Sequence, residues 1–291
     1  MSSPFFVPFN FLGLGKDLCS WEQSKIVVLP VPYDLTTSYL SGTRRGPLAI
    51  LEASAHMELF DDETLHEVAS QGIHTLDQLE PVTSGPQDMV EQVQAVVSKI
   101  LDAGKFPVVI GGEHSITAGA VKALKQRFEA ITVVQFDAHA DMRNSYQHSP
   151  YNHACVGRRI AEMCDLVQIG IRSLSKEEHD FLATSSIRTF FARDLLTDNQ
   201  WIEQLLALLP RDIYITIDLD VLDPSIMPSV GTPEPGGLGW YDITGVLKIL
   251  AEQKRIVGFD VVELCPQPAN PAPDFLAAKL CYKLLSYVYS N

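Results

Sequence analysis

Eight short apolar runs, separated by stretches that favour helices, constrain the fold of this chain more than any other feature. The runs cover residues 25–31, 72–76, 107–110, 131–136, 166–171, 187–191, 212–220 and 255–262. Such βα alternation predicts an α/β protein with a largely parallel sheet that is covered by helices on both faces. A closed eight-stranded barrel is the alternative, and the lengths of the runs do not decide between the two.

The stretches between these runs carry the apolar spacing of amphipathic helices. In residues 89–103, Val90, Val93 and Val97 fall on one stripe. Further helices are predicted at residues 115–128, 201–209, 241–253 and 275–288. No linker rich in Ser and Gly divides the sequence and no internal repeat is present, so we expect residues 1–291 to form a single domain.

The charge balance narrows the classes of partner. The chain has 22 basic and 36 acidic residues, which gives a formal net charge of −14. This acidity disfavours binding to nucleic acid or to an anionic membrane, and it favours a small cationic partner. No apolar run approaches the roughly 20 residues of a membrane span, and no signal peptide is recognisable. The five cysteines are odd in number and include no CxxC pair, so we expect free thiols and a cytoplasmic location.

Three candidate metal ligands follow the run at residues 131–136 at alternate positions. They are Asp137, His139 and Asp141. In an extended chain, residues i, i+2 and i+4 point to the same side, so these side chains could converge on one point. Taken alone, the same residues could instead be turn residues or helix caps.

Other candidate ligands also lie where apolar runs end. His114 follows the run at residues 107–110, and Glu263 follows the last run. Asp218 and Asp220 close the run at residues 212–220. Because ligands of open parallel sheets bind outside the carboxyl ends of the strands, we expect these side chains to share one site. For the two aspartates alone, capping of a strand end before a turn explains the pattern equally well.

The two histidines and four aspartates among these side chains form a donor set that suits two divalent cations. The set contains two imidazoles, four carboxylates and no thiolate, which favours Mn²⁺ or a similar first-row ion over a structural Zn²⁺. Two divalent ions would also balance the four negative charges of the aspartates. The candidate metal ligands are His114, Asp137, His139, Asp141, Asp218 and Asp220.

Three motifs resemble the metal-binding motifs of the ureohydrolases, the family of arginase and agmatinase. They are Gly-Gly-Glu-His-Ser at residues 111–115, Asp-Ala-His-Ala-Asp at residues 137–141 and Asp-Leu-Asp-Val-Leu-Asp-Pro at residues 218–224. The resemblance implies a three-layer α/β/α sandwich on a mainly parallel eight-stranded sheet. It also implies two Mn²⁺ per chain on the six ligands above, and a homo-oligomer that is a trimer or a hexamer.

The resemblance also assigns roles to residues outside the ligand set. His153 matches the family's active-site histidine that is not a ligand, which makes it a candidate proton shuttle. Glu263 matches the glutamate that faces the substrate guanidinium, and a carboxylate can pair with that group through two parallel hydrogen bonds. Asp141 would hydrogen-bond the nucleophile while it ligates metal. We therefore expect Asp141, His153 and Glu263 to be catalytic residues, and His153 and Glu263 to bind substrate as well.

The sequence is more similar to agmatinases than to arginases. Arg143 stands where arginases usually have the asparagine that holds the α-carboxylate of the substrate, so it is a candidate substrate-binding residue. The expected reaction is hydrolysis of agmatine to putrescine and urea, a step of polyamine biosynthesis. Guanidinobutyrate, aminopropylagmatine or arginine is the alternative substrate, since Arg143 could also bind a carboxylate. A folded relative without turnover is the remaining alternative.

Overall fold

All eight predicted strands form one parallel sheet in the computed structural model, which describes residues 7–195, 197–198 and 200–290. The strands are β1 (Ile26–Val31), β2 (Ile73–Thr75), β3 (Phe106–Gly111), β4 (Thr132–Phe136), β5 (Asp165–Ile171), β6 (Arg188–Phe191), β7 (Asp212–Asp218) and β8 (Arg255–Val262). Their order is β2-β1-β3-β8-β7-β4-β5-β6, and every neighbouring pair is parallel. β2 and β6 are open edges, so the sheet does not close into a barrel.

The strands form where apolar and β-branched residues run together, because both faces of a parallel sheet are covered. All six residues of β1 are buried, and so are all five residues of β4. Successive side chains of a strand point to opposite faces. Accordingly, Val27 and Val28 belong to two different apolar cores, one on each side of the sheet.

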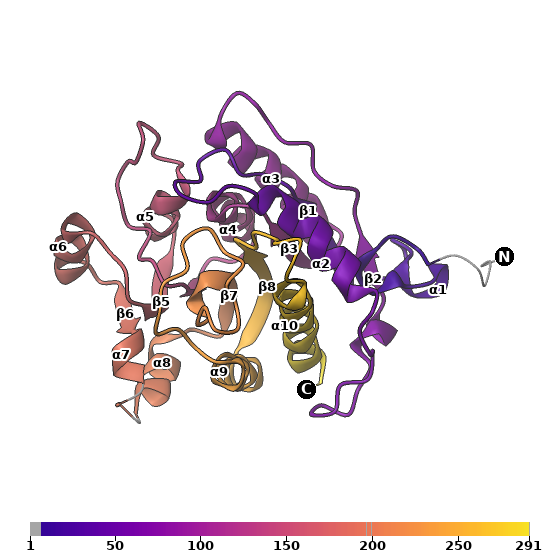
Figure 1. Cartoon of the computed structure of the whole chain (residues 1–291). Helices are drawn as coiled ribbons and strands as arrows, with labels where there is room; N and C mark the ends of the chain where they lie inside the picture. The colour runs from indigo at the N-terminus through magenta and orange to yellow at the C-terminus, as the bar shows by residue number, and fades with distance from the viewer. Residues whose placement is uncertain (1–6, 196, 199, 291) are drawn as a thin grey trace.

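Helices cover both faces of the sheet (Figure 1). One face packs against α2 (Gly46–Ser54), α8 (Trp201–Leu208), α9 (Trp240–Gln253) and α10 (Ala272–Tyr289). The other face packs against α3 (Pro86–Asp102), α4 (Thr117–Arg127), α5 (Val156–Ala161) and α6 (Lys176–Thr184). Two further α-helices, α1 (Lys16–Cys19) and α7 (Ala192–Leu195), have one turn each. The three-layer α/β/α sandwich that the sequence predicts is therefore confirmed.

Helix α3 shows how local sequence sets the bounds of an element. It begins at Pro86, whose fixed φ suits the first turn of a helix. Val90, Val93 and Val97 are fully buried, as their stripe predicts. Gly104 follows the helix with a φ of +69°, a conformation that glycine adopts without steric cost.

The end of β7 and the stretch that follows β4 differ from the prediction, and both differences shape the candidate site. β7 ends at Asp218, and residues 219–221 form a 3₁₀ turn in which the Asp218 carboxylate accepts the backbone N–H of Asp220 at 2.9 Å. β4 ends at Phe136, and Asp141 has a φ of +52°. Asp141 and Asp220 therefore reach the site from turns, and not by alternation along an extended strand.

Four adjacent strands place the candidate residues together at the carboxyl ends of the central strands. β3, β8, β7 and β4 lie side by side in its centre. The chain passes from β3 through α4 to β4, and β7 and β8 later fill the gap between them. The helices after β3 and β4 cover one face of the sheet, whereas those after β7 and β8 cover the other. Connections that leave on opposite faces open a crevice at the carboxyl ends of the strands, which is where ligands bind in open α/β sheets.

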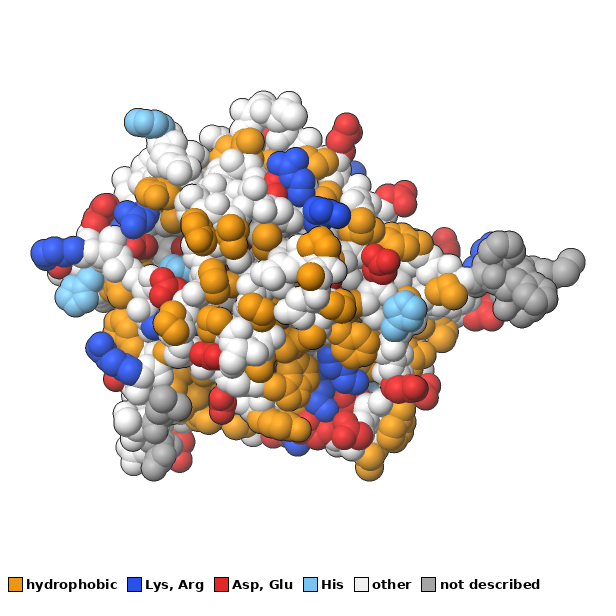
Figure 2. All heavy atoms as spheres, in the orientation of Figure 1, with side chains coloured by type: hydrophobic (Ala, Val, Ile, Leu, Met, Phe, Trp, Pro, Cys, Tyr) orange, Lys and Arg blue, Asp and Glu red, His pale blue; other side chains and the backbone are white. Residues whose placement is uncertain are grey.

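The surface mixes side chains of every kind. On the face shown in Figure 2, Lys and Arg side chains are dispersed among acidic and apolar ones and do not form one continuous patch. Within the part of the chain that the structure describes, no helix is both long enough and apolar enough to span a membrane.

Candidate metal centre and active-site pocket

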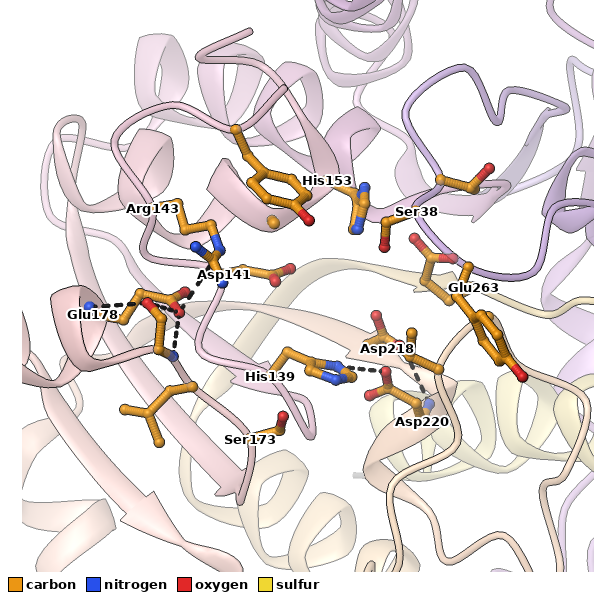
Figure 3. A pocket seen from close by; sticks show the side chains of 18 of the residues that line it. Ser38, His139, Asp141, Arg143, His153, Ser173, Glu178, Asp218, Asp220 and Glu263 are labelled. Carbon is orange, nitrogen blue, oxygen red and sulfur yellow. Dashed lines mark hydrogen bonds and ion pairs between the residues drawn. The ribbon is translucent and has the colours of Figure 1, made fainter. Parts of the chain in front are cut away.

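The six candidate metal ligands come together at the carboxyl ends of β3, β4 and β7. His114 begins the turn after β3, and Asp137 follows β4 directly. Five of the six are buried, and only the side chain of His139 is partly exposed, at 25%. Figure 3 shows His139, Asp218 and Asp220 next to one another, with Asp141 facing them. The fold therefore unites the residues of all three sequence motifs.

His114 forms the centre of a first group of ligands. Its Nδ1 atom lies 3.1 Å from Oδ2 of Asp137, and 3.4 Å from Oδ2 of both Asp141 and Asp218. This nitrogen is fully buried and has no hydrogen-bond partner among the described residues. A buried nitrogen without a partner, aimed at three carboxylates, leaves a polar atom that a metal ion would satisfy.

A buried chain of hydrogen bonds holds His114 in one tautomer. Its Nε2 atom lies 2.9 Å from Oγ1 of Thr216, and that hydroxyl lies 2.5 Å from Oδ1 of Asp260. Tyr214 donates its hydroxyl to the other oxygen of Asp260 at 2.7 Å. Since the Thr216 hydroxyl has only one proton and donates it to Asp260, it accepts the Nε2–H of His114. The lone pair on Nδ1 is then available to bind a metal ion.

His139 forms the centre of a second group. Its Nδ1 atom lies 2.8 Å from Oδ2 of Asp220 and 3.8 Å from Oδ1 of Asp137. Asp137 thus directs one oxygen to His114 and the other to His139, so its carboxylate is shared by the two groups. The other oxygen of Asp220 accepts the backbone N–H of Ala138 at 3.0 Å, which joins the third motif to the second.

Each group could hold one metal ion. Within a group, the ligand atoms all lie within 4.8 Å of one another. The groups are His114 with Asp137 and Asp218, and Asp137 with His139 and Asp220. Carboxylate and imidazole ligands without a thiolate fit divalent first-row cations.

The protonation of these side chains shows how much negative charge the fold concentrates here. Burial and the carboxylate of Asp220 raise the pKa of Asp137, and burial and Asp137 raise the pKa of Asp141 to about 7. Burial opposes protonation of His139, but the neighbouring Asp220 outweighs it and raises the pKa of His139 to about 11. Without metal, bound protons offset part of this negative charge. Two divalent cations would offset it in their place.

A cavity of about 300 Å³ opens above the two groups. The candidate residues that line it are His139, Asp141, Arg143, His153, Asp218, Asp220 and Glu263. Figure 3 shows Arg143 and Glu178 at one end of the cavity, and Asp218 and Glu263 at the other. Every predicted catalytic and substrate-binding residue is therefore accessible to a small molecule in one cavity.

Glu263 lies at the end of β8 with one oxygen anchored. Its Oε1 atom accepts the backbone N–H of His114 at 2.7 Å. Its backbone has a φ of +67°, a conformation that costs a residue other than glycine on the order of 1–3 kcal/mol and is typical of binding sites. Burial raises the pKa of Glu263 well above its usual range. A cation in the cavity would favour the ionised carboxylate again.

His153 directs its imidazole into the same cavity (Figure 3). It begins a 3₁₀ turn that Asn152 caps by accepting the backbone N–H of Ala154 at 3.0 Å. Burial lowers the pKa of His153 to about 4, so the imidazole is neutral at neutral pH. A neutral imidazole must accept a proton before it can donate one, which is what the expected proton shuttle would do.

Arg143 lines the cavity but already has a partner. Its Nε atom lies 3.9 Å from Oε2 of Glu178, and its guanidinium carbon lies 4.8 Å from the centre of the Tyr146 ring. Glu178 is itself fixed, because it accepts the backbone N–H groups of Met142 at 2.9 Å and Ser175 at 2.7 Å. The positive charge of Arg143 is therefore partly offset by Glu178 before any substrate binds.

Arg172 supports the site and was not among the residues that sequence reasoning singled out for it. Its guanidinium donates to the backbone carbonyl oxygens of Asp220 at 2.6 Å, Glu234 at 2.8 Å and Pro235 at 3.1 Å. It thereby joins the third motif to the Gly- and Pro-rich loop that follows it. Thr216 and Asp260 were also missed, because contacts between distant residues leave no local spacing signal.

The sequence matches the arginase family over residues 24–286, a range that contains every candidate site residue. The chain belongs to the arginase family. It is therefore a ureohydrolase, a hydrolase that acts on guanidino compounds, as its three motifs imply.

Relatives of this arginase-family chain match it over almost its whole length. An N(1)-aminopropylagmatine ureohydrolase from Synechocystis sp. is 40% identical over 96% of this chain and 94% of its own. An agmatinase from Pyrococcus horikoshii is 36% identical over 91% of this chain and 92% of its own. The crystal structure of the agmatine ureohydrolase of Thermoplasma volcanium matches with a TM-score of 0.89 at 33% identity, over 98% of this chain and 96% of that one.

Proposed function

We propose that this chain is a Mn²⁺-dependent ureohydrolase that cleaves the guanidinium group of agmatine to give putrescine and urea. The observation that carries the proposal is the common cavity of Glu263, His153 and the two groups of candidate metal ligands. Guanidine hydrolysis needs an activated water, a carboxylate that orients the guanidinium, and a group that moves a proton. The described residues of this cavity offer a candidate for each task.

The two groups of ligands would each hold one Mn²⁺. The first ion would be held by the group around His114, with Asp141 as a further ligand, and the second by the group around His139. Asp137 would contact both ions, since its two oxygens face the two groups. When bound, two divalent cations supply the Lewis acidity that lowers the pKa of a water molecule to about 7.

The side chains of the cavity would carry out the remaining tasks. Asp141 would accept a hydrogen bond from the attacking water, because its carboxylate lines the cavity beside the first group. Glu263 would hold the guanidinium through Oε2 while Oε1 stays bonded to the backbone of His114. His153 would accept a proton at a ring nitrogen and return it to the leaving amine.

The end of the cavity that Arg143 and Glu178 line, here called its outer end, favours a substrate whose second end is an amine. A free arginine there would attract a substrate carboxylate, as in guanidinobutyrate or arginine. Arg143 is instead paired with Glu178 and stacked on Tyr146. We therefore interpret Arg143 as a residue that shapes the outer wall of the cavity and does not bind a carboxylate.

Aminopropylagmatine is the second candidate substrate, and one observation favours it. The relative from Synechocystis sp. that carries this name is 40% identical, against 36% for the agmatinase from Pyrococcus horikoshii. Aminopropylagmatine has the same guanidinium end as agmatine and one more ammonium group. Its chemistry at Glu263 would therefore be unchanged, and selectivity would depend on the outer end of the cavity.

We also propose that the chain acts in the cytoplasm as a homo-oligomer, either a trimer or a hexamer, without nucleic-acid or membrane partners. The net charge of −14 supports the preference for small cationic partners. The oligomeric state rests on the family resemblance, and sedimentation of the purified protein tests it directly.

A panel of guanidines tests the proposed reaction. Urea release by the purified, Mn²⁺-loaded protein would be measured with agmatine, aminopropylagmatine, guanidinobutyrate and arginine side by side. The proposal predicts the highest kcat/KM for agmatine, and a higher value for aminopropylagmatine would make that compound the substrate. A preference for guanidinobutyrate or arginine would contradict our interpretation of Arg143. Absence of urea from all four would indicate a relative without turnover or another substrate.

A further inference from the structure

A buried threonine links His153 to a glutamate that has no role in the proposed chemistry. Thr36 lies in the loop after β1 and is only 8% exposed, and Glu113 is fully buried. Oγ1 of Thr36 lies 2.9 Å from the backbone nitrogen of His153 and 3.3 Å from its Nδ1 atom. The same hydroxyl oxygen lies 2.7 Å from Oε1 of Glu113. Neither Thr36 nor Glu113 belongs to the described residues that line the cavity.

Glu113 is itself fixed in position. Its Oε2 atom accepts the backbone N–H of Thr36 at 2.6 Å. Its Oε1 atom accepts the hydroxyl of Ser115 at 2.5 Å in addition to that of Thr36. Because a backbone N–H can only donate, the atom at the Oε2 position must be an acceptor. The carboxylate therefore presents a fixed acceptor to the Thr36 hydroxyl.

The protons available in this group of atoms fix the direction of each hydrogen bond. A threonine hydroxyl donates one hydrogen bond and accepts two. The Thr36 hydroxyl donates to Glu113, so both of its lone pairs accept from His153, one from the backbone N–H and one from Nδ1. Nδ1 of His153 must then carry the ring proton, and Nε2 keeps its lone pair.

We propose that Thr36, oriented by Glu113, is a positioning residue that keeps His153 in the Nδ1–H tautomer with Nε2 free to carry a proton in the cavity. The imidazole is directed into the cavity (Figure 3). Its Nδ1 atom faces the Thr36 hydroxyl at 3.3 Å. This inference rests on the proposed function, because it adds a device to the proton-transfer role of His153.

The fixed tautomer serves a balanced sequence of proton transfers. As the water oxygen forms its bond to the guanidinium carbon, one water proton passes to Nε2 of His153, which becomes an imidazolium. When the C–N bond breaks, its electron pair stays on the leaving nitrogen, and the imidazolium returns the proton to that nitrogen. The second water proton also reaches the amine as the urea carbonyl forms, so the products are urea and an alkylammonium ion. The opposite tautomer would have no lone pair in the cavity to begin this sequence.

Replacing Glu113 by glutamine makes the sharpest structural prediction. The backbone N–H of Thr36 would hold the amide oxygen at the Oε2 position, so the amide NH₂ would stand at the Oε1 position. That NH₂ would donate to the Thr36 hydroxyl, which must then donate its own proton elsewhere. The nearest acceptor is Nδ1 of His153. Glu113→Gln should therefore invert the tautomer of His153 to Nε2–H.

The tautomer can be measured independently of activity. The chain has 8 histidines, so ¹⁵N-histidine spectra of the full-length, metal-free protein would be assigned by the signals lost in His153→Ala. We expect a protonated Nδ1 and an unprotonated Nε2 for His153 in the wild type and in Thr36→Ser, and the reverse in Glu113→Gln. A wild-type His153 protonated at Nε2 would overturn the inference.

Kinetics provide the second readout. Thr36→Val keeps the size of the side chain and removes the hydroxyl, and we expect kcat to fall about tenfold to a hundredfold with little change in KM. Thr36→Ser should restore kcat to within about threefold of the wild type, because it restores the hydroxyl. Thr184→Val, on the exposed surface of α6, controls for the substitution itself. Bound metal and the melting temperature would be measured for each variant.

The outcomes separate this inference from the function on which it rests. If the wild type releases urea and Thr36→Val keeps the wild-type kcat, the positioning role is wrong and the proposed function stands. If no guanidine yields urea and His153 still shows the Nδ1–H tautomer, the proposed function is wrong and the hydrogen-bond relay stands. If Thr36→Val fails to fold, the tautomers of the wild type and Glu113→Gln still decide the question.

Discussion

Arg172 donates a hydrogen bond of 2.6 Å to the backbone carbonyl of Asp220, and so fixes the turn that carries a candidate ligand. The same guanidinium reaches the carbonyl of Glu234 at 2.8 Å, and the carboxylate of Glu234 lies 3.7 Å from Nε2 of His139. Among the described residues, no carboxylate forms an ion pair with Arg172. The charge of Arg172 is therefore directed at backbone carbonyl groups of the candidate metal centre. Loss of the Arg172 guanidinium should change metal binding before it changes the fold.

Arg172→Lys should weaken the second metal site, because a lysine ammonium cannot reach several carbonyl oxygens with a planar fork. We expect an affinity about 10- to 100-fold lower for one of two Mn²⁺ ions. Calorimetric titration of the metal-free protein measures this, with Arg193→Lys as the exposed control. Two ions bound with wild-type affinity in Arg172→Lys would show that the turn does not need this contact.

The shared carboxylate of Asp137 predicts unequal effects of two substitutions. Asp137→Ala removes a ligand from both groups, so we expect loss of both metal ions and of urea release. His139→Ala removes a ligand from one group only, so one ion per chain should remain. Metal analysis of the dialysed proteins distinguishes the two results. Retention of two ions by Asp137→Ala would contradict its place in the site.

The raised pKa of Asp141 predicts that stabilisation by Mn²⁺ grows with pH. Without metal, the folded chain binds a proton at Asp141 up to about pH 7, while the unfolded chain releases it near the ordinary value of 3.8. That contribution to stability is complete below the unfolded pKa and is lost as pH rises through the folded pKa. Metal binding displaces the proton, so metal and proton compete at low pH.

Melting temperatures with and without Mn²⁺ at pH 5, 6, 7 and 8 provide the measurement. We expect the difference between the two to increase steadily across this range. A difference that is constant or shrinks with pH would mean that the protonation of Asp141 is not coupled to metal binding.

A buried ion pair outside the lining of the cavity predicts a large effect on stability alone. Nζ of Lys283 lies 2.9 Å from Oδ2 of Asp61 and 2.9 Å from Oε2 of Glu63, and the side chains of Lys283 and Asp61 are 8% and 0% exposed. Lys283→Ala would leave the Asp61 carboxylate buried without its partner, which costs about 3–5 kcal/mol of unfolding free energy.

Denaturant unfolding monitored by circular dichroism measures this cost. Lys176→Ala, whose side chain is 86% exposed, is the matched control and should lower the unfolding free energy by less than about 1 kcal/mol. Equal effects of the two substitutions would show that the buried pair is not a major source of stability. The fraction of Lys283→Ala protein that stays folded should keep its Mn²⁺ content, because the ion pair of Lys283 and Asp61 lies outside the site.

The sequence predicts most of the fold, because the features that determine it are local. Apolar runs such as β1 and stripes such as Val90, Val93 and Val97 are visible over a few residues, and the structure confirms both. The three motifs also place the candidate ligands near one another. The way in which Asp141 and Asp220 reach the site was predicted incorrectly. Both were expected to alternate along an extended strand, but a positive φ at Asp141 and a 3₁₀ turn at Asp220 leave no alternation pattern in the sequence.

The supporting residues could not be found in the same way. Thr36 and His153 are 117 positions apart in the sequence, and Asp260 reaches His114 through Thr216. No spacing rule connects such residues, because strand order and loop packing bring them together. The single domain over residues 1–291, the homo-oligomer and the choice of Mn²⁺ stay predictions.

Titration of Mn²⁺ into the metal-free protein, with urea release from agmatine as the readout, tests the central claim most directly. If the two groups around His114 and His139 are metal sites that act together, urea release should rise with added Mn²⁺ and level off at two equivalents per chain. Full activity without metal, a plateau at one equivalent, or two ions bound without any urea from agmatine or aminopropylagmatine would contradict the account.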